Sequence, residues 1–446
     1  MGEQNKNLSL STLFFFGAAT FAMHFGGSCM LWPVTWGQQS GSSVLIAMIG
    51  IFFTALVLPY AAYVAMVRAE GSFWDMASRI NPKFGFVFGG LTIAVLGPLF
   101  VIPRMSSAAW DAMCQVFQIT EPSIAVVITF QVTYYAVTYW FLFKQAQILD
   151  KLGKYLTPIL CLTVAAVVFK SLSNPMSDWV PQFYPESALK YGLINGYQTM
   201  DLPGSLVFGS IIILNIKAKG LQGSSLLKAL LLVTGIGFLM LATTHFSQML
   251  VGASTGTIYE DVSYARLYAT TVLDLWGRVG GAIFNIALLL AALTSAVGLS
   301  SGCAEFFTEA TKGKWAYKPV VIVILIISAA IATFELNTIV KLSAPILSLI
   351  YPPCIAVVMG NIVCGPKRMG AISIATIVAF AWGLIDGGIG YLGIVGVDLT
   401  GFKAVYNLVP LATYELGWLI PTIIGGIIGY IFIDKKKEAA AMRKVD

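Results

Sequence analysis

The chain has 446 residues, of which 57% are hydrophobic and 11% charged, and its formal net charge is +6. Apolar runs of about 20 residues between short polar joints exclude a soluble globular protein and predict a polytopic membrane protein. The small basic excess forms no stripe, so nucleic-acid binding is not indicated. The 6 cysteines show no CxxC spacing and there are only 2 histidines, which predicts neither a disulfide framework nor a metal centre of such ligands.

In chain order, the apolar runs predict twelve membrane-spanning helices with no room for a separate soluble domain. The longest joints, at roughly 172–189 and 252–274, are candidates for gates or lids. The predicted helices cover approximately residues 9–37, 43–67, 84–112, 122–143, 153–171, 190–216, 225–251, 275–303, 319–336, 340–362, 370–389 and 408–433.

The polar joints also predict how the chain is oriented in the membrane. Most of the 27 Lys and Arg residues fall in joints on the side that holds both termini. Because cytoplasmic joints carry the excess of basic residues, both termini are expected to be cytoplasmic in a bacterial inner membrane. Basic residues predicted on that side include Arg68, Lys144, Lys217, Lys314 and Lys435.

The first predicted helix is interrupted within residues 21–33, FAMHFGGSCMLWP, by two glycines, a serine and a cysteine. Each glycine weakens a helix by about 1 kcal/mol relative to alanine. Non-helical backbone at membrane depth is tolerated only where protein buries it or it lines a water-filled cavity, so this segment is a candidate binding site. The alternative is that Gly26 and Gly27 only allow neighbouring helices to pack closely.

The sixth predicted helix is interrupted within residues 194–209, INGYQTMDLPGSLVFG, which has an acid, a proline and a glycine at its centre. Two broken helices in matching places of two halves indicate a secondary transporter. We therefore predict one membrane domain, residues 1–446, with inverted repeats at about 9–171 and 190–362 and two additional helices at about 370–433.

Five stretches, in order along most of the chain, carry a family resemblance: FAMHFGG with GQQSG (37–41), GPLFVIPR (97–104), GYQTMD with LVFG (196–209), ALTSAVGLSSGCAEFF (292–307) and APILSLIYPP (344–353). They resemble the branched-chain amino acid:cation symporter family of the amino acid-polyamine-organocation superfamily, which includes bacterial leucine, isoleucine and valine carriers. The resemblance implies an all-α integral membrane fold of five-plus-five inverted repeats, leucine-transporter-like, with helices one and six broken.

The opening stretch departs from the family pattern at several positions. Ser28 and Cys29 stand where the family has a glycine and an asparagine, and Val34 stands where it has a second proline. His24 stands where an aromatic apolar residue is usual. These departures concern side-chain specificity and leave the implied fold unchanged.

An amino acid reaches its site as a zwitterion, so its carboxylate requires donors and its ammonium requires acceptors. Backbone N–H groups freed at the first break, where a new half-helix starts, suit the carboxylate. Backbone carbonyls freed at the second break suit the ammonium. The predicted substrate-binding residues are Met23, His24, Gly26, Gly27, Ser28, Thr199, Met200, Asp201 and Gly204.

Three ionisable side chains are predicted near the breaks, at membrane depth. A lone carboxylate there costs about 2.5–3.5 kcal/mol, so Asp201 must be paired, hydrated or protonated. It either contacts the substrate ammonium or caps N–H groups and holds the break in shape. Arg104 either pairs with Asp201, as a gate or a structural pair, or extends to the membrane interface. His24 either contacts the substrate, senses pH, or is a neutral histidine bonded to a carbonyl.

Thr294 and Ser295 place two adjacent hydroxyl groups in the eighth predicted helix. Because sodium prefers hard oxygen ligands, this pair indicates sodium as the coupling ion. In the resembled fold an Ala-x-x-Thr-Ser pattern forms a sodium site with backbone carbonyls of helix one. The alternative is that both hydroxyls bond to carbonyls of their own helix. The fifth helix core, YLTPILCLTVAAVVF, has no lysine that could replace the ion, as one does in proton-coupled relatives. The predicted ligands are Ala22, Phe25, Ala291, Thr294 and Ser295.

The resulting prediction is a sodium-coupled symporter that imports leucine, isoleucine and valine by alternating access. Apolar residues at the breaks, without a nearby basic residue, favour a neutral apolar substrate. The alternatives are another neutral amino acid, such as threonine or methionine, and coupling to protons.

Two other classes of function are not indicated. An intramembrane enzyme would require a nucleophile with a base, a His/Glu cluster or an aspartate pair, and none is present, so no catalytic residue is predicted. A channel would favour repeated pore-lining rings over two dissimilar broken helices. The expected partners are a small-molecule amino acid and the lipid bilayer, with no nucleic acid and no organic cofactor. The oligomeric state is not predicted.

Overall fold

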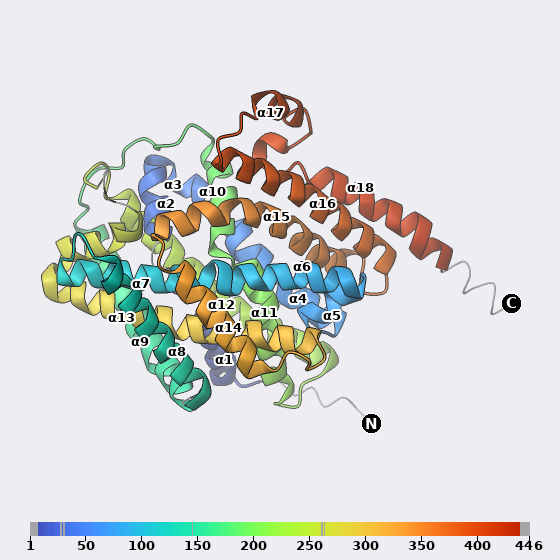
Figure 1. Cartoon of the computed structure of the whole chain (residues 1–446), viewed down its shortest axis with the longest axis horizontal. Helices are drawn as coiled ribbons and strands as arrows, with labels where there is room; N and C mark the ends of the chain where they lie inside the picture. The colour runs from blue at the N-terminus through green and yellow to red at the C-terminus, as the bar shows by residue number, and fades with distance from the viewer. Residues whose placement is uncertain are drawn as a thin grey trace. The chain divides into compact units, whose positions relative to one another are not determined.

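A computed structural model describes residues 8–26, 29, 32–144, 146–259, 262 and 264–437. All regular elements in this part of the chain are helical, as predicted (Figure 1). Among the described residues, seven helices are long and apolar enough to cross a membrane, or eight if a bent pair, Ala188–Thr199 with Asp201–Lys217, counts as one span. The count of twelve spans stays a prediction.

The chain forms two compact units whose segments alternate along the sequence. The first consists of Met1–Leu56, Ala94–Asp201 and Leu231–Lys341. The second consists of Val57–Ile93, Leu202–Leu230 and Leu342–Asp446. Both predicted helix breaks, at Gly26 and just before Asp201, lie in the first unit.

The first unit is built around a long helix, α13, that packs against α7, α9 and α14, while α3 packs against α10. Its helices are α1 (Leu10–His24), α2 (Trp32–Ser40), α3 (Val44–Ile51), α7 (Val101–Phe117), α8 (Ile124–Lys144), α9 (Ala146–Ser173), α10 (Ala188–Gly196), α13 (Tyr264–Ala310), α14 (Tyr317–Ile331) and the part of α12 (Gly223–Ala253) from residue 231. Figure 1 shows α8 and α9 side by side.

Small residues allow close helix contacts in this unit. A Cβ atom added to Gly192 in α10 would collide with the carbonyl oxygen of Ala47 in α3. Trp36, Tyr191 and Met249 belong to a buried cluster that joins these helices to α2 and α12. Close backbone approach at small residues is how helices pack in membranes, where burial of apolar surface provides little driving force.

The second unit pairs α16 with α18 (Figure 1). The carboxylate of Asp434, at the end of the π-helical turn that follows α18, accepts hydrogen bonds of 2.8 Å from the backbone N–H groups of Gly370 and Ala371 at the start of α16. The helices of this unit are α4 (Leu58–Ala69), α5 (Phe73–Ser78), α6 (Pro82–Ala94) up to residue 93, α11 (Asp201–Lys217) from residue 202, the part of α12 up to residue 230, α15 (Leu336–Val363) from residue 342, α16 (Met369–Ile394), α17 (Thr400–Tyr406) and α18 (Leu419–Gly429).

Several predicted spans are less regular than the sequence indicated. The predicted helix 408–433 begins only at Leu419, because the preceding segment contains Pro410 and turns through positive φ angles at Leu411 (68°) and Glu415 (58°). The short helices α5 and α17 were not predicted. The predicted start of the eighth span near residue 275 agrees with a kink in α13 at Gly277, where φ is 66°.

Candidate functional site

The first break starts where α1 ends, at His24. The N–H of Gly26 donates to the carbonyl of His24 at 2.9 Å and not to Ala22, four residues earlier, so the Ala22 carbonyl loses its helical donor. The backbone N–H of Cys29 donates to the carbonyl of Gly26 at 3.0 Å, and its thiol donates to the carbonyl of His24 at 3.1 Å. The predicted site residues Gly27 and Ser28 lie outside the described residues.

The second break separates α10 from α11. A 3-10 turn, Tyr197–Thr199, follows α10, and Met200 adopts a left-handed conformation with φ of 57° before α11 begins at Asp201. Pro203 has no N–H to donate to the carbonyl of Thr199, which is therefore left available as an acceptor. The predicted site residue Gly204 lies in the first turn of α11.

The two breaks meet through a pair of ionisable side chains. Nδ1 of His24 lies 2.8 Å from Oδ1 of Asp201, and the two residues are 6% and 4% exposed. Oδ2 of Asp201 is buried without a hydrogen-bond partner among the described residues. The carboxylate partner of His24 was not predicted, because the two residues are far apart in the sequence.

Arg104 does not form the predicted pair with Asp201 in the described part of the chain. Its Nη2 donates to the backbone carbonyl of Gln198 at 3.2 Å, and its guanidinium lies 4.9 Å from the ring centre of Trp32. The side chain is 2% exposed, so it does not extend to the membrane interface either. A planar cation can bond to a carbonyl and stack on an aromatic ring at once; here the carbonyl comes from the turn before Asp201 and the ring from the start of α2.

A second histidine, His245 in α12, forms with His24, Asp201 and Arg104 the group of buried ionisable residues called the buried cluster below, and it was not predicted from the sequence. It is 1% exposed, its Nδ1 lies 2.8 Å from the carbonyl of Leu241, and its Nε2 is buried without a partner among the described residues. It interacts electrostatically with both Asp201 and His24. The one feature of the sequence that could have drawn attention to His245 is that the chain has only 2 histidines.

The predicted sodium ligands lie partly at the first break. A Cβ atom added to Gly26 would come within 2.7 Å of Oγ of Ser295, so α13 places this hydroxyl against the end of α1. The hydroxyl of Thr294 donates to the carbonyl of Ala291 at 3.0 Å, the bond expected under the alternative interpretation. That bond leaves the lone pairs of the hydroxyl available as acceptors, and the sodium site stays a prediction.

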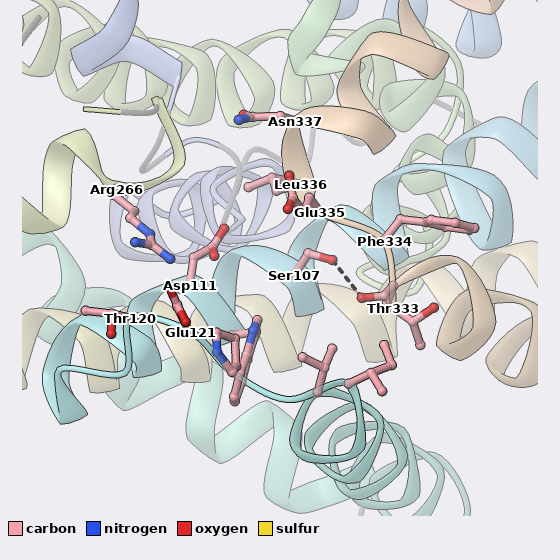
Figure 2. A pocket seen from close by; sticks show the side chains of 15 residues that line it. Ser107, Asp111, Thr120, Glu121, Arg266, Thr333, Phe334, Glu335, Leu336 and Asn337 are labelled. Carbon is pink, nitrogen blue, oxygen red and sulfur yellow. Dashed lines mark hydrogen bonds between the residues drawn. The ribbon is translucent and has the colours of Figure 1, made fainter. Parts of the chain in front are cut away.

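A separate polar cavity of about 500 Å³ occupies the first unit near the C-terminal half of α7. Figure 2 shows Arg266 and Asp111 at this cavity, with Glu121 and Glu335 also on its wall. Ser107 donates to the carbonyl of Ala332 at 3.2 Å. None of the predicted site residues lines it. Its walls come from three parts of the chain that are far apart in the sequence, at residues 107–127, 266 and 332–337, so no local sequence pattern could have predicted it.

Sequence comparisons identify the family. Residues 9–436 match the family model described as branched-chain amino acid transport protein. The branched-chain amino acid permease BraB of Bacillus subtilis (strain 168) is 29% identical, over 95% of this chain and 96% of the relative. The permease BrnQ of Salmonella typhimurium (strain LT2) is 27% identical, over 100% of this chain and 99% of the relative.

Solved structures confirm the predicted leucine-transporter-like fold class. Mhp1, a nucleobase-cation-symport-1 family transporter in a closed conformation with bromovinylhydantoin bound, aligns over 98% of this chain and 96% of its own, with a TM-score of 0.65 and 14% identity. MhsT in complex with L-phenylalanine aligns over 96% and 99%, with a TM-score of 0.54 and 14% identity. At this identity the likeness concerns the fold alone. The family model, which matches residues 9–436, identifies the chain as a member of the branched-chain amino acid transport protein family, whose members are membrane transporters and not enzymes.

Proposed function

We propose that the protein imports leucine, isoleucine and valine together with sodium by alternating access, in a bacterial inner membrane with both termini in the cytoplasm. The observation that carries this proposal is the buried meeting of two broken helices, where His24 at the end of α1 contacts Asp201 at the start of α11. The names of the relatives, branched-chain amino acid permeases, support the substrate class.

In this proposal the two breaks bind the two charged ends of the amino acid. The N–H groups of Gly26, Gly27 and Ser28 bind the carboxylate at the start of a half-helix. The carbonyls of Thr199 and Met200 bind the ammonium. The interrupted backbone provides hydrogen-bonding groups that replace the water around each charged end of the substrate. Both ends can therefore be buried without a large desolvation penalty.

The side chain of the substrate would lie among apolar groups such as Met23, Phe25 and Met200. Each buried methylene contributes about 0.8 kcal/mol, so the three extra carbons of leucine over alanine are worth about 2.4 kcal/mol, or about 60-fold in affinity. Neighbouring apolar side chains are discriminated weakly. Leucine, isoleucine and valine should therefore compete with one another and outcompete alanine.

Sodium would bind between the end of α1 and α13, through the carbonyls of Ala22, Phe25 and Ala291 and the hydroxyls of Thr294 and Ser295. One sodium supplies enough energy for accumulation. A membrane potential of about 100 mV provides about 2.3 kcal/mol per charge, and a tenfold sodium gradient adds about 1.4. The sum of about 3.7 kcal/mol corresponds to accumulation of several hundredfold.

The test is uptake of labelled leucine into proteoliposomes with an inward sodium gradient. Excess isoleucine and valine should inhibit uptake, and Thr294→Ala should raise the sodium concentration for half-maximal uptake by about tenfold through loss of one hydroxyl ligand. Thr129→Ala is the matched control, because Thr129 makes a similar bond to its own helix on the exposed side of α8.

Two results would reject parts of the proposal. Inhibition by serine, threonine or a charged amino acid, without inhibition by isoleucine and valine, would reject the branched-chain substrates. Sodium dependence that is the same in Thr294→Ala and Thr129→Ala would reject the sodium site and leave the hydroxyl with its bond to Ala291 alone.

A further inference from the structure

The two carboxylate oxygens of Asp201 lie in different surroundings. Oδ1 is 2.8 Å from Nδ1 of His24, whereas Oδ2 is buried and has no hydrogen-bond partner in the part of the chain that the structure describes. Burial removes the water that would otherwise bond to this oxygen, so leaving it without a donor is unfavourable. Oδ2 is therefore the atom at which an incoming donor gains most.

The backbone next to Asp201 favours a donor with several N–H bonds. Because Pro203 cannot donate to it, the carbonyl of Thr199 is an available acceptor beside the start of α11. The hydroxyl of Thr199 is already used, since it donates to the carbonyl of Gly196 at 3.0 Å and accepts from the N–H of Asp201 at 3.3 Å. An ammonium group has three donors and no acceptor, so it matches a carboxylate oxygen beside a carbonyl.

His24 is the described side chain that holds this carboxylate. An ionised carboxylate can only accept, so Nδ1 of His24 is assigned as the donor, and a neutral ring suffices for this role. The ring is itself held in place, because it packs 5.0 Å from the ring of Phe238, and the thiol of Cys29 bonds to the carbonyl of His24.

The two other ionisable side chains of the buried cluster, Arg104 and His245, form hydrogen bonds to backbone carbonyls. Arg104 donates to the carbonyl of Gln198, and Nδ1 of His245 donates to the carbonyl of Leu241. His245 interacts with Asp201 electrostatically. Neither forms a hydrogen bond to the side chain of Asp201 within the described residues.

We propose that His24 is a positioning residue for the substrate's α-ammonium group: it holds Oδ1 of Asp201 so that Oδ2 receives the ammonium. The proposal deepens the transport function proposed above and rests on it. Selectivity then depends on the ammonium group of the substrate. The site should bind α-amino acids and reject carboxylic acids of the same shape that lack this group.

The test compares leucine with 4-methylpentanoate, which is leucine without its ammonium group, as competitors of labelled leucine binding to the purified protein. His24→Asn keeps an N–H donor at the same number of bonds from Cα as Nδ1, whereas His24→Gln moves the donor one bond further and His24→Phe removes it. Asp201→Asn removes the charge of the acceptor. The quantity measured is the ratio of the two inhibition constants.

Wild type and His24→Asn should prefer leucine strongly, and the preference should fall by about 10- to 100-fold in His24→Gln, His24→Phe and Asp201→Asn, the loss expected for a hydrogen bond to a charged group. A ratio that stays at the wild-type value in His24→Phe would overturn the proposal. So would an equal loss in His24→Asn and His24→Gln, because a merely structural role would not depend on where the donor lies.

Failure of the proposed substrate assignment would be visible separately. If leucine does not bind, the same ratios are measured with the amino acid that most stabilises the purified protein and with its counterpart lacking the amine. The preference for the amine and its dependence on His24 are then tested independently of which amino acid is carried.

Discussion

The contact between Gly26 and Ser295 allows the first break to be tested by adding a single carbon. In Gly26→Ala the new Cβ would lie 2.7 Å from Oγ of Ser295 and 2.9 Å from Cε of Met105. The methionine end can move, but the hydroxyl belongs to the proposed sodium site. Overpacking of this kind costs about 1–3 kcal/mol, and the lower chain entropy of alanine returns about 0.4–1. A net loss of about 1–2 kcal/mol is expected.

The assay is denaturant unfolding of the purified protein at several sodium concentrations, with Gly298→Ala as the control. Gly298 lies in the same helix as Ser295, and a Cβ there meets nothing within 4 Å. The control should be neutral or slightly stabilising. Gly26→Ala should lose stability and require about tenfold more sodium for the same stabilisation, since the Ser295 hydroxyl must shift.

A double variant identifies the cause of that loss. In Gly26→Ala with Ser295→Ala the colliding oxygen is gone, so the two substitutions should be non-additive, as expected for residues in contact. Strictly additive effects, or a Gly26→Ala protein with wild-type stability and sodium dependence, would refute the reasoning that α13 supplies a hydroxyl at this break.

Three further predictions follow from contacts away from that pair. A cysteine introduced at Thr120 should react with an impermeant thiol reagent added outside intact cells and one at Gly313 should not; the reverse labelling would reject the predicted orientation. Arg104→Lys should lower stability by about 1–2 kcal/mol, because a lysine cannot both bond to Gln198 and stack on Trp32, and an unchanged denaturation midpoint would contradict this. Asp434→Asn should cost about 1–2 kcal/mol through loss of one of two bonds to α16, while leaving the sodium dependence of leucine uptake unchanged; altered sodium dependence would show that this contact reaches beyond the helix ends.

The positions of the helix breaks could be predicted from the sequence because their causes are local. Gly26 and Gly27 weaken the first helix wherever they occur, and Pro203 removes a helical hydrogen bond whatever surrounds it. The adjacency of Thr294 and Ser295 was equally readable. Which of the two hydroxyls faces the break depends on how α13 is rotated against α1, and that is a tertiary property.

The partners of the buried charges could not be predicted, because they come from distant segments. Asp201 was matched with Arg104 on charge, whereas it lies against a histidine 177 residues earlier in the chain. Arg104 instead reaches a carbonyl and an aromatic ring, which no charge count reveals. His245 lies in an apolar helix whose sequence gives no sign of its electrostatic interaction with Asp201.

The pairing of His24 with Asp201 also agrees with the electrostatics of the two helix ends. The C-terminal end of a helix carries partial negative charge and the N-terminal end partial positive charge. His24 is the basic residue in the last turn of α1, and Asp201 is the acidic residue in the first turn of α11. A carboxylate therefore suits the start of α11, by about 0.3–1 kcal/mol or more where burial limits screening. Because the N-terminal end of a helix favours negative charge, the carboxylate suits the α11 side, beside the carbonyls of the second break, where the ammonium is proposed to bind.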